Sequence, residues 1–285
     1  MLKRTISGAC FVAIVVGFFL LREYVDYRLF QILTFFFMGV GTFEVARALK
    51  DYAIKPILLI ATIFGVLFVP QYSVFEYWIM PGYGFIFALD LIILFALFIA
   101  IYCIIKKERT KTFFVSLIPL VYPALFILTM LTCNDLSLHK GFLAALMVFV
   151  IAPCSDTMAY LVGMTYSKIR KGNVKKLCPN LSPKKTWAGA IGGTIGGALG
   201  GLIVYFAIRS QADLINFFSP LFFFILVGLV GSVITIFGDL LESYLKRKVG
   251  LKDMGKIMPG HGGVMDRIDG ISALSVFVFF MFLFV

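Results

Sequence analysis

Residues 238–270 read GDLLESYLKRKVGLKDMGKIMPGHGGVMDRIDG, a charged stretch between two apolar runs. The stretch contains four aspartates, one glutamate, four lysines and two arginines. Charged groups beside apolar helices cost free energy unless they meet partners, water or ions. The stretch therefore predicts a polar site built at the ends of apolar helices.

The composition of the whole chain indicates an integral membrane protein. Of its 285 residues, 61% are hydrophobic and only 14% are charged, and the mean hydropathy is +0.99. A soluble domain is about half apolar and about a quarter charged. The net charge of +11 would suggest nucleic acid as the partner of a soluble protein. In a membrane protein it reflects basic loops and anionic lipid, so no nucleic-acid partner is expected.

Apolar runs long enough to cross a bilayer as helices recur along the chain. They predict an all-α polytopic bundle of about nine transmembrane helices, near residues 5–21, 28–46, 54–70, 81–105, 112–132, 140–165, 187–208, 216–240 and 264–284. Residues 1–135 are expected to form a scaffold of five spans, and residues 136–285 a catalytic transmembrane region with cytosolic loops. Arg22 follows the first run where a signal peptide would have its cleavage site, so this run is expected to be a retained helix.

The distribution of basic residues predicts the orientation of the chain. Of the 26 lysines and arginines, 21 fall on the side of the predicted bundle that carries the charged stretch, and four fall on the other side. Cytoplasmic loops carry the excess of lysine and arginine. We therefore expect a multi-pass protein of the cell membrane whose polar site faces the cytoplasm.

The carboxylates of the charged stretch have the spacing of a metal site. Asp266 and Asp269 lie three residues apart at the start of an apolar run, and a helix would place them on one face. Asp239, Glu242 and Ser243 share a face in the same way. Because like charges repel, a cation such as Mg²⁺ is a natural partner, with Asp239, Asp266 and Asp269 as its ligands. The alternative is a set of loop charges that pair only with lysines.

Glycines and basic residues around these carboxylates suit a phosphate-bearing substrate. The run from Pro259 to Gly263 cannot form a regular helix, and its glycines let backbone N–H groups approach an anion. Lys246, Arg247 and Lys252 add positive charge. An ordinary basic loop beside a membrane would show a similar composition.

At these positions the chain resembles the phosphatidate cytidylyltransferases, also called CDP-diacylglycerol synthases. The resemblance rests on Ser243, Lys246, Arg247, Lys252, Asp253, Pro259 to Gly263, Asp266, Arg267 and Asp269. Two further strings are similar to the family's patterns, from Ser155 to Gly163 and from Ser182 to Trp187. The chain departs from the family at Ala188, which replaces an acidic residue, and in the extra residues 167–174. Together these strings cover about residues 150–270.

The resemblance implies an enzyme of phospholipid biosynthesis that joins CTP and phosphatidic acid into CDP-diacylglycerol and pyrophosphate. It implies Mg²⁺ as the cofactor and a membrane lipid as one of the two substrates. It leaves open whether the enzyme is a homodimer. The candidate catalytic residues are Asp156, Asp239, Asp266 and Asp269. The candidate substrate-binding residues are Ser182, Lys184, Lys185, Ser243, Lys246, Arg247, Lys252, His261, Gly262, Gly263 and Arg267.

Two other functions remain open from the residues alone. A CTP-dependent lipid kinase would share the nucleotide and the membrane location, but would transfer the γ-phosphate. A secondary transporter would use Asp156, which lies within an apolar run, to carry an ion. Transporters often show two related halves with interrupted helices, and only the C-terminal part of this sequence shows such a region.

Local patterns give three further expectations. Ser182 and Pro183 are typical of a helix start, as N-cap and first helical residue. The glycines between residues 189 and 201 recur at helical spacing, which indicates close helix packing and not a phosphate loop. Glu44 and Asp90 fall within apolar runs, where a carboxylate is either functional or the acceptor of a structural hydrogen bond.

Overall fold

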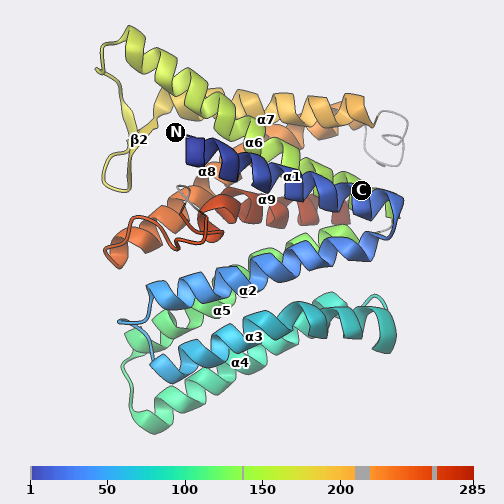
Figure 1. Cartoon of the computed structure of the whole chain (residues 1–285), viewed down its shortest axis with the longest axis vertical. Coiled ribbons are helices and arrows are strands. Elements are labelled where there is room, and N and C mark those ends of the chain that lie inside the picture. The colour runs from blue at the N-terminus through green and yellow to red at the C-terminus, as the bar shows by residue number, and fades with distance from the viewer. Residues whose placement is uncertain (1, 137, 209–218, 259–261) are drawn as a thin grey trace. The chain divides into compact units, whose positions relative to one another are not determined.

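The computed structural model describes residues 2–136, 138–208, 219–258 and 262–285 and divides them into two compact units. The first unit is Met1–Thr132 with Lys248–Arg267, and the second is Cys133–Arg247 with Ile268–Val285. Both are built from long helices (Figure 1). The charged stretch is therefore shared between the units, and its loop folds with the N-terminal helices.

The first unit contains five long helices and two short helical turns. They are α1 (Leu2–Tyr24), η1 (Tyr27–Leu29), α2 (Phe30–Ala48), α3 (Lys55–Val74), η2 (Phe75–Ile79), α4 (Gly84–Lys106) and most of α5 (Thr110–Asp135). Large side chains of α2 and α3, among them Phe30, Phe37 and Phe68, are completely or almost completely buried. Figure 1 shows α2, α3 and α4 lying side by side.

The second unit contains α6 (Leu138–Ile169), β1 (Lys176–Cys178), β2 (Ser182–Thr186), α7 (Trp187–Ala207), nearly all of α8 (Pro220–Lys248) and most of α9 (Met265–Leu283). The strands β1 and β2 form a small antiparallel hairpin at one end of the α6–α7 pair (Figure 1). Residues 209–218, where one predicted span ends and the next begins, lie outside the described residues.

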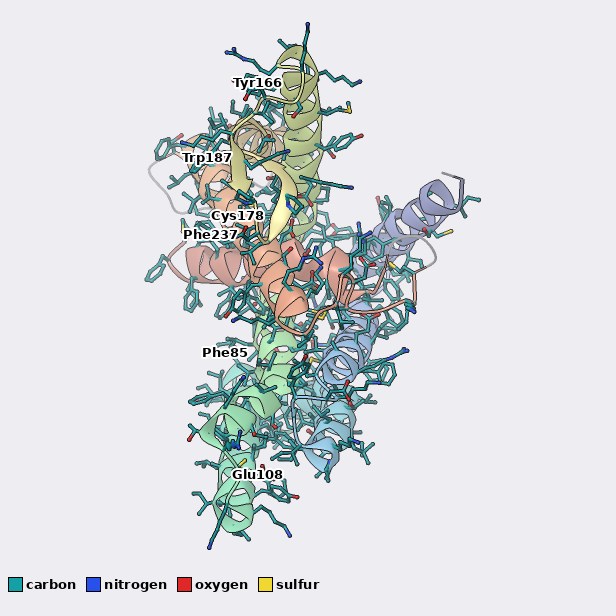
Figure 2. The ribbon with its side chains drawn as sticks, turned by 90° about the vertical axis from the view of Figure 1, so that its left-hand side faces the viewer. Phe85, Glu108, Tyr166, Cys178, Trp187 and Phe237 are labelled. Carbon is teal, nitrogen blue, oxygen red and sulfur yellow. The ribbon has the colours of Figure 1, made fainter. Side chains whose placement is uncertain are left out.

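The predicted class of the fold is confirmed. Eight of the described helices are long and apolar enough to cross a membrane. Their outer surfaces are apolar as well, as Phe237 on α8 shows with a side chain that is 65% exposed (Figure 2). Such surfaces suit lipid, because a soluble protein rarely exposes so many large apolar side chains. The ninth predicted span corresponds to α9, which begins with the charged residues Asp266, Arg267 and Asp269.

The glycine repeat acts in helix packing, as predicted. A Cβ atom added at Gly192 would lie 2.6 Å from the side chain of Val162, and one at Gly200 would lie 3.0 Å from the backbone of Ile151, so α7 packs directly on α6. Gly197 and Gly201 make equally close approaches to α8. Small residues at helical spacing thus let α7 contact helices on two sides.

The expected helix start at Ser182 is wrong. Residues 182–186 form the strand β2, and α7 begins at Trp187, where the side chain of Thr186 accepts a hydrogen bond from Gly189 N at 3.0 Å. Thr186 is therefore the N-cap, a position that threonine fills well. Ser182 instead opposes Cys178 in the hairpin. Pro183 is compatible with a two-stranded hairpin because each strand has a free edge.

The helix α8 extends beyond its predicted end near residue 240. It continues to Lys248, so Lys246 and Arg247 lie on the same helix as Glu242 and Ser243 and not in a loop. Glutamate, lysine, arginine and leucine all favour helix, which explains why the helix continues past its apolar part. The extension gives the polar residues of this segment a rigid support.

Candidate active site

The approach of α8 to α9 positions the first group of charged residues. A Cβ atom added at Gly238 would lie 2.5 Å from the Cβ of Ala273 and 2.9 Å from the carbonyl oxygen of Asp269. Gly270 is similarly close to Thr235. Because only glycine permits this approach, the backbone of Asp239, next to Gly238, lies beside that of Asp269.

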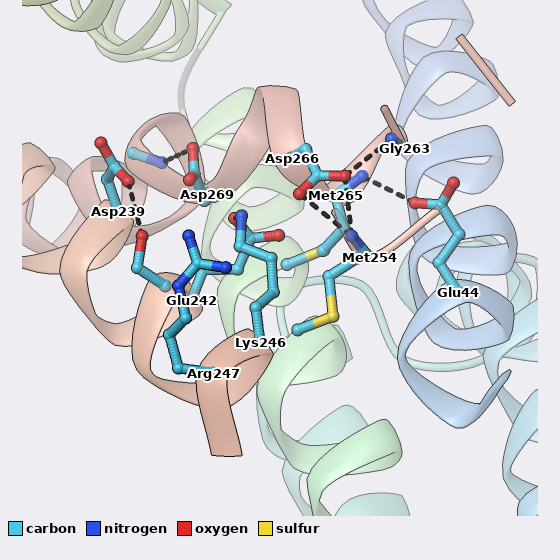
Figure 3. A network of polar contacts seen from close by, with 12 residues as sticks. Glu44, Asp239, Glu242, Lys246, Arg247, Met254, Gly263, Met265, Asp266 and Asp269 are labelled. Carbon is cyan, nitrogen blue, oxygen red and sulfur yellow. Dashed lines mark hydrogen bonds and ion pairs between the residues drawn. The ribbon is translucent and has the colours of Figure 1, made fainter. Parts of the chain in front are cut away.

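Five side chains of the second unit then form a carboxylate–lysine cluster, defined as Lys185, Asp239, Glu242, Lys246 and Asp269. Lys185 forms an ion pair with Asp239. Lys246 Nζ lies 2.7 Å from Glu242 Oε2, and the Glu242 side chain is completely buried. Asp269 lies within electrostatic reach of Asp239, Glu242 and Lys246. Figure 3 shows Glu242 and Lys246 on neighbouring turns of α8.

Two further hydrogen bonds lie beside this cluster, one within α8 and one between α8 and the residue before β2. The Ser243 hydroxyl donates to Asp239 Oδ1 at 3.4 Å, which confirms that the two side chains share a face. Arg247 Nε donates to the carbonyl oxygen of Leu181 at 3.4 Å. Together with the ion pair of Lys185 and Asp239, this bond brings the segment from Leu181 to Lys185 onto α8, although the two segments are far apart in sequence.

Asp266 lies in the first unit and has a different environment. Its two carboxylate oxygens accept hydrogen bonds from Met254 N, at 3.1 and 2.9 Å, and Oδ2 also accepts one from Gly263 N at 2.7 Å. The side chain is nearly buried. Figure 3 shows these bonds at the start of α9. The carboxylate therefore fixes the loop that connects α8 to α9, which we call the signature loop (residues 249–264).

The backbone of the signature loop is compact where it is described. Met258 N donates to the carbonyl oxygen of Gly262 at 2.9 Å. Gly262 has a φ of +91°, a conformation that favours glycine, and a Cβ atom there would lie 2.8 Å from Asp266 Oδ2. His261, a predicted substrate-binding residue, lies outside the described residues.

Most of the remaining candidates occupy exposed positions. Lys184 on β2, Lys252 in the signature loop and Arg267 on α9 are exposed, as expected for groups that bind a ligand from water. Asp156 lies on the exposed side of α6, whereas its neighbour Ser155 is completely buried. Ser182 is half-buried in the hairpin. Their roles in a site stay predictions.

The donor atoms of the cluster fit a divalent cation by their chemistry. Asp239 and Asp269 of the cluster supply carboxylate oxygens, and the neighbouring Ser243 supplies a hydroxyl. Oxygen ligands of this kind are those that Mg²⁺ prefers. Within the described part of the chain, no group of three or more His, Cys, Asp or Glu side chains is arranged to hold a metal ion. Lys185 forms an ion pair with Asp239, and Lys246 forms one with Glu242.

Two carboxylates contribute more than the sequence indicated. Glu44 on α2 accepts hydrogen bonds from Val264 N at 3.2 Å and from Met265 N at 2.9 Å, and it is 1% exposed. Glu242 is the buried partner of Lys246. The position of Glu44 within an apolar run indicated an intramembrane carboxylate, but it did not indicate the hydrogen-bond donors that Glu44 contacts.

Comparison with known proteins agrees with the resemblance. A phosphatidate cytidylyltransferase of Haemophilus influenzae is 34% identical over 148 residues, which are 52% of this chain and 48% of the relative. A protein of the same name from Brucella abortus is 36% identical over 139 residues, covering 49% and 46%. A third, from Rickettsia conorii, is 37% identical over 136 residues, covering 48% and 56%. The chain spans about half the length of the curated relatives it matches.

The match to a family description extends further along the chain. The family model of the cytidylyltransferases matches residues 2–285, and therefore includes both units and every candidate residue. Neither the lipid kinase nor the transporter is supported by these relatives. The chain belongs to the cytidylyltransferase family.

Proposed function

We propose that the chain transfers the cytidylyl group of CTP to phosphatidic acid, with CDP-diacylglycerol and pyrophosphate as products, in phospholipid biosynthesis. The observation that carries the proposal is the ion pair of Lys185 with Asp239. It joins the string from Ser182 to Trp187, which resembles the phosphatidate cytidylyltransferases, to α8, the helix that also carries Ser243, Lys246 and Arg247 of the first string. The relatives that match the chain carry that name, which supports the same reaction.

The reaction needs no covalent intermediate with the protein. An oxygen of the phosphatidate phosphate attacks the α-phosphorus of CTP and forms a new P–O bond. The bond from that phosphorus to the oxygen bridging the α- and β-phosphates breaks, and its electron pair leaves on pyrophosphate. Transfer of this kind depends mainly on the positioning of the groups and on stabilisation of charge.

The described residues supply both contributions. Lys184, Arg247 and Lys252 are exposed cations able to bind the triphosphate and the lipid phosphate. Backbone N–H groups of a glycine-rich loop favour anions as well. Asp239 and Asp269 of the second unit would hold Mg²⁺, and Asp266 is a ligand predicted from the sequence; the ion would supply positive charge to the leaving pyrophosphate. Lys185 and Lys246 form ion pairs with the carboxylates of Asp239 and Glu242.

The function is tested directly with purified protein. Pyrophosphate release is measured with CTP, MgCl₂ and phosphatidic acid in detergent micelles, and diacylglycerol, which lacks the attacking phosphate, serves as the control acceptor. We expect release that requires phosphatidic acid and Mg²⁺. Equal release with both lipids would contradict the proposed acceptor, and no release with either would contradict the reaction.

The proposed site faces the cytoplasm, where CTP is found. Cys178 on β1 is a partly exposed free thiol in the β1–β2 hairpin, so its labelling can report on the orientation. In a variant that retains Cys178 as its single cysteine, a membrane-impermeant maleimide should label this thiol in permeabilised cells and leave it unlabelled in intact cells. Labelling of Cys178 in intact cells at the same rate would contradict the proposed orientation.

A further inference from the structure

Glu44 contacts the signature loop at the start of α9. One carboxylate oxygen accepts from Val264 N and the other from Met265 N, at 3.2 and 2.9 Å. The first backbone N–H groups of a helix have no partners within the helix, and negative charge is favourable there. Glu44 therefore caps α9 from a different helix, α2, within the first unit.

Two glycines of the loop leave room for this carboxylate. A Cβ atom added at Gly263 would lie 2.6 Å from Cδ of Glu44, and one added at Gly255 would overlap the same carboxyl group. Neither glycine has the left-handed φ that Gly250 and Gly262 have. Space beside Glu44, and not backbone conformation, explains glycine at positions 255 and 263.

Asp266 holds the same segment through other N–H groups. It accepts from Met254 and Gly263, whereas Glu44 accepts from Val264 and Met265. The two carboxylates thus fix the described residues on both sides of Pro259–His261, the centre of the loop's resemblance to the family. The N-terminal helices contribute to the loop through Glu44.

We propose that Glu44 is a positioning residue, which holds the signature loop in the geometry that binds CTP and so sets the rate of transfer. This inference rests on the proposed function, because it concerns the loop that is proposed to bind CTP. Glu44 itself is buried and bonds to backbone N–H groups at the start of α9. Its effect on catalysis acts through the position of the loop.

The chain offers a matched control in Glu76. Its carboxylate accepts from Gly82 N at 2.9 Å and from Gly84 N at 2.7 Å, and a Cβ atom at Gly84 would lie 2.9 Å from Glu76 Cβ. Glu76 therefore fixes a loop of the same unit by the same device, away from the charged stretch. Glu44→Gln and Glu76→Gln each replace one of the two accepting oxygens by an amide group that cannot accept.

The first test compares the two variants by kinetics, thermal unfolding and hydrogen exchange. We expect Glu44→Gln to lower kcat at saturating CTP by about 10- to 100-fold, as the loss of a group that orients ligands does. Amides of residues 252–265 should exchange faster, while those of α3 and α4 are unchanged. Glu76→Gln should keep the wild-type kcat. If both variants lost kcat equally, in proportion to their lost thermal stability, Glu44 would contribute only to stability and the proposed positioning role would be wrong.

The second test uses Gly255→Ala, which does not depend on the folding of Glu44→Gln. The added methyl group meets Glu44 and should displace the loop, with a loss of kcat similar to that of Glu44→Gln. In a Glu44→Ala background the methyl group has room, so Gly255→Ala should cause no additional loss. Independent, multiplying losses would contradict the proposed contact.

The two proposals fail in different ways. If wild-type protein does not transfer the cytidylyl group, while Glu44→Gln still accelerates exchange in residues 252–265 alone, the reaction is wrong and the loop contact stands. If the wild type is active, and Glu44→Gln changes neither kcat nor exchange in the loop, the role of Glu44 is overturned and the reaction stands.

Discussion

Asp269→Asn is expected to lower kcat by on the order of 10²–10³-fold, the loss seen when one group that stabilises transition-state charge is removed. Asp269 belongs to the carboxylate–lysine cluster and is a proposed ligand of Mg²⁺. The amide cannot supply the negative charge that Mg²⁺ prefers. Thermal unfolding should remain close to that of the wild type, because the Asn carbonyl oxygen can still accept the bond from Gly270 N, which is 2.7 Å long.

The measurement is steady-state pyrophosphate release over a range of MgCl₂ concentrations, with unfolding followed in the same detergent. Asp90→Asn is the control, because Asp90 is an exposed carboxylate within another apolar helix, α4. It should leave kcat unchanged. Normal activity of Asp269→Asn with an unchanged requirement for Mg²⁺ would make Asp269 a structural charge.

Asp266→Asn is expected to abolish turnover and to destabilise the protein as well. Three hydrogen-bond contacts from two backbone N–H groups converge on the Asp266 carboxylate. Asparagine has one accepting oxygen in place of two, and its amide nitrogen would face an N–H donor. Hydrogen bonds to a charged group contribute about 1.5–3 kcal/mol each, so a loss of about 2–4 kcal/mol in the free energy of unfolding is expected.

Comparison of the two variants separates their roles. Unfolding temperature and hydrogen exchange in residues 249–264 should change in Asp266→Asn and remain unchanged in Asp269→Asn. A stable Asp266→Asn variant with wild-type exchange in the loop would show that the bonds to Met254 and Gly263 contribute little. Asp266 would then act only through its charge toward the metal.

Apolar runs and their spacing were sufficient to predict the helices, because a bilayer requires long stretches without charge. The span near residues 187–208 and the packing role of the glycine repeat were predicted from such patterns, whereas the helix start expected at Ser182 was wrong. The end of α8 was not, because the hydrophobic pattern stops near residue 240 while helix-forming polar residues continue to Lys248. The strand β2 at Ser182–Thr186 was missed because a Ser-Pro pair also occurs at helix starts.

Contacts within one helix of the site could be predicted from the sequence, whereas contacts between distant segments could not. The shared face of Asp239 and Ser243 follows from helical spacing alone, and the structure confirms it. The ion pair of Lys185 with Asp239 and the contact of Glu44 with Val264 connect residues distant in sequence. No local pattern specifies such a partner. A sequence can therefore indicate a buried carboxylate without indicating the residue to which it bonds.

In the proposed reaction the α-phosphorus of CTP is the atom attacked. The most direct measurement follows the label from α-³²P CTP and, separately, from γ-³²P CTP in the presence of phosphatidic acid and Mg²⁺. The proposed reaction places the α-label in the lipid fraction and releases the γ-label as pyrophosphate. Transfer of the γ-label to lipid, with the α-label remaining in soluble CDP, would contradict it and identify a lipid kinase.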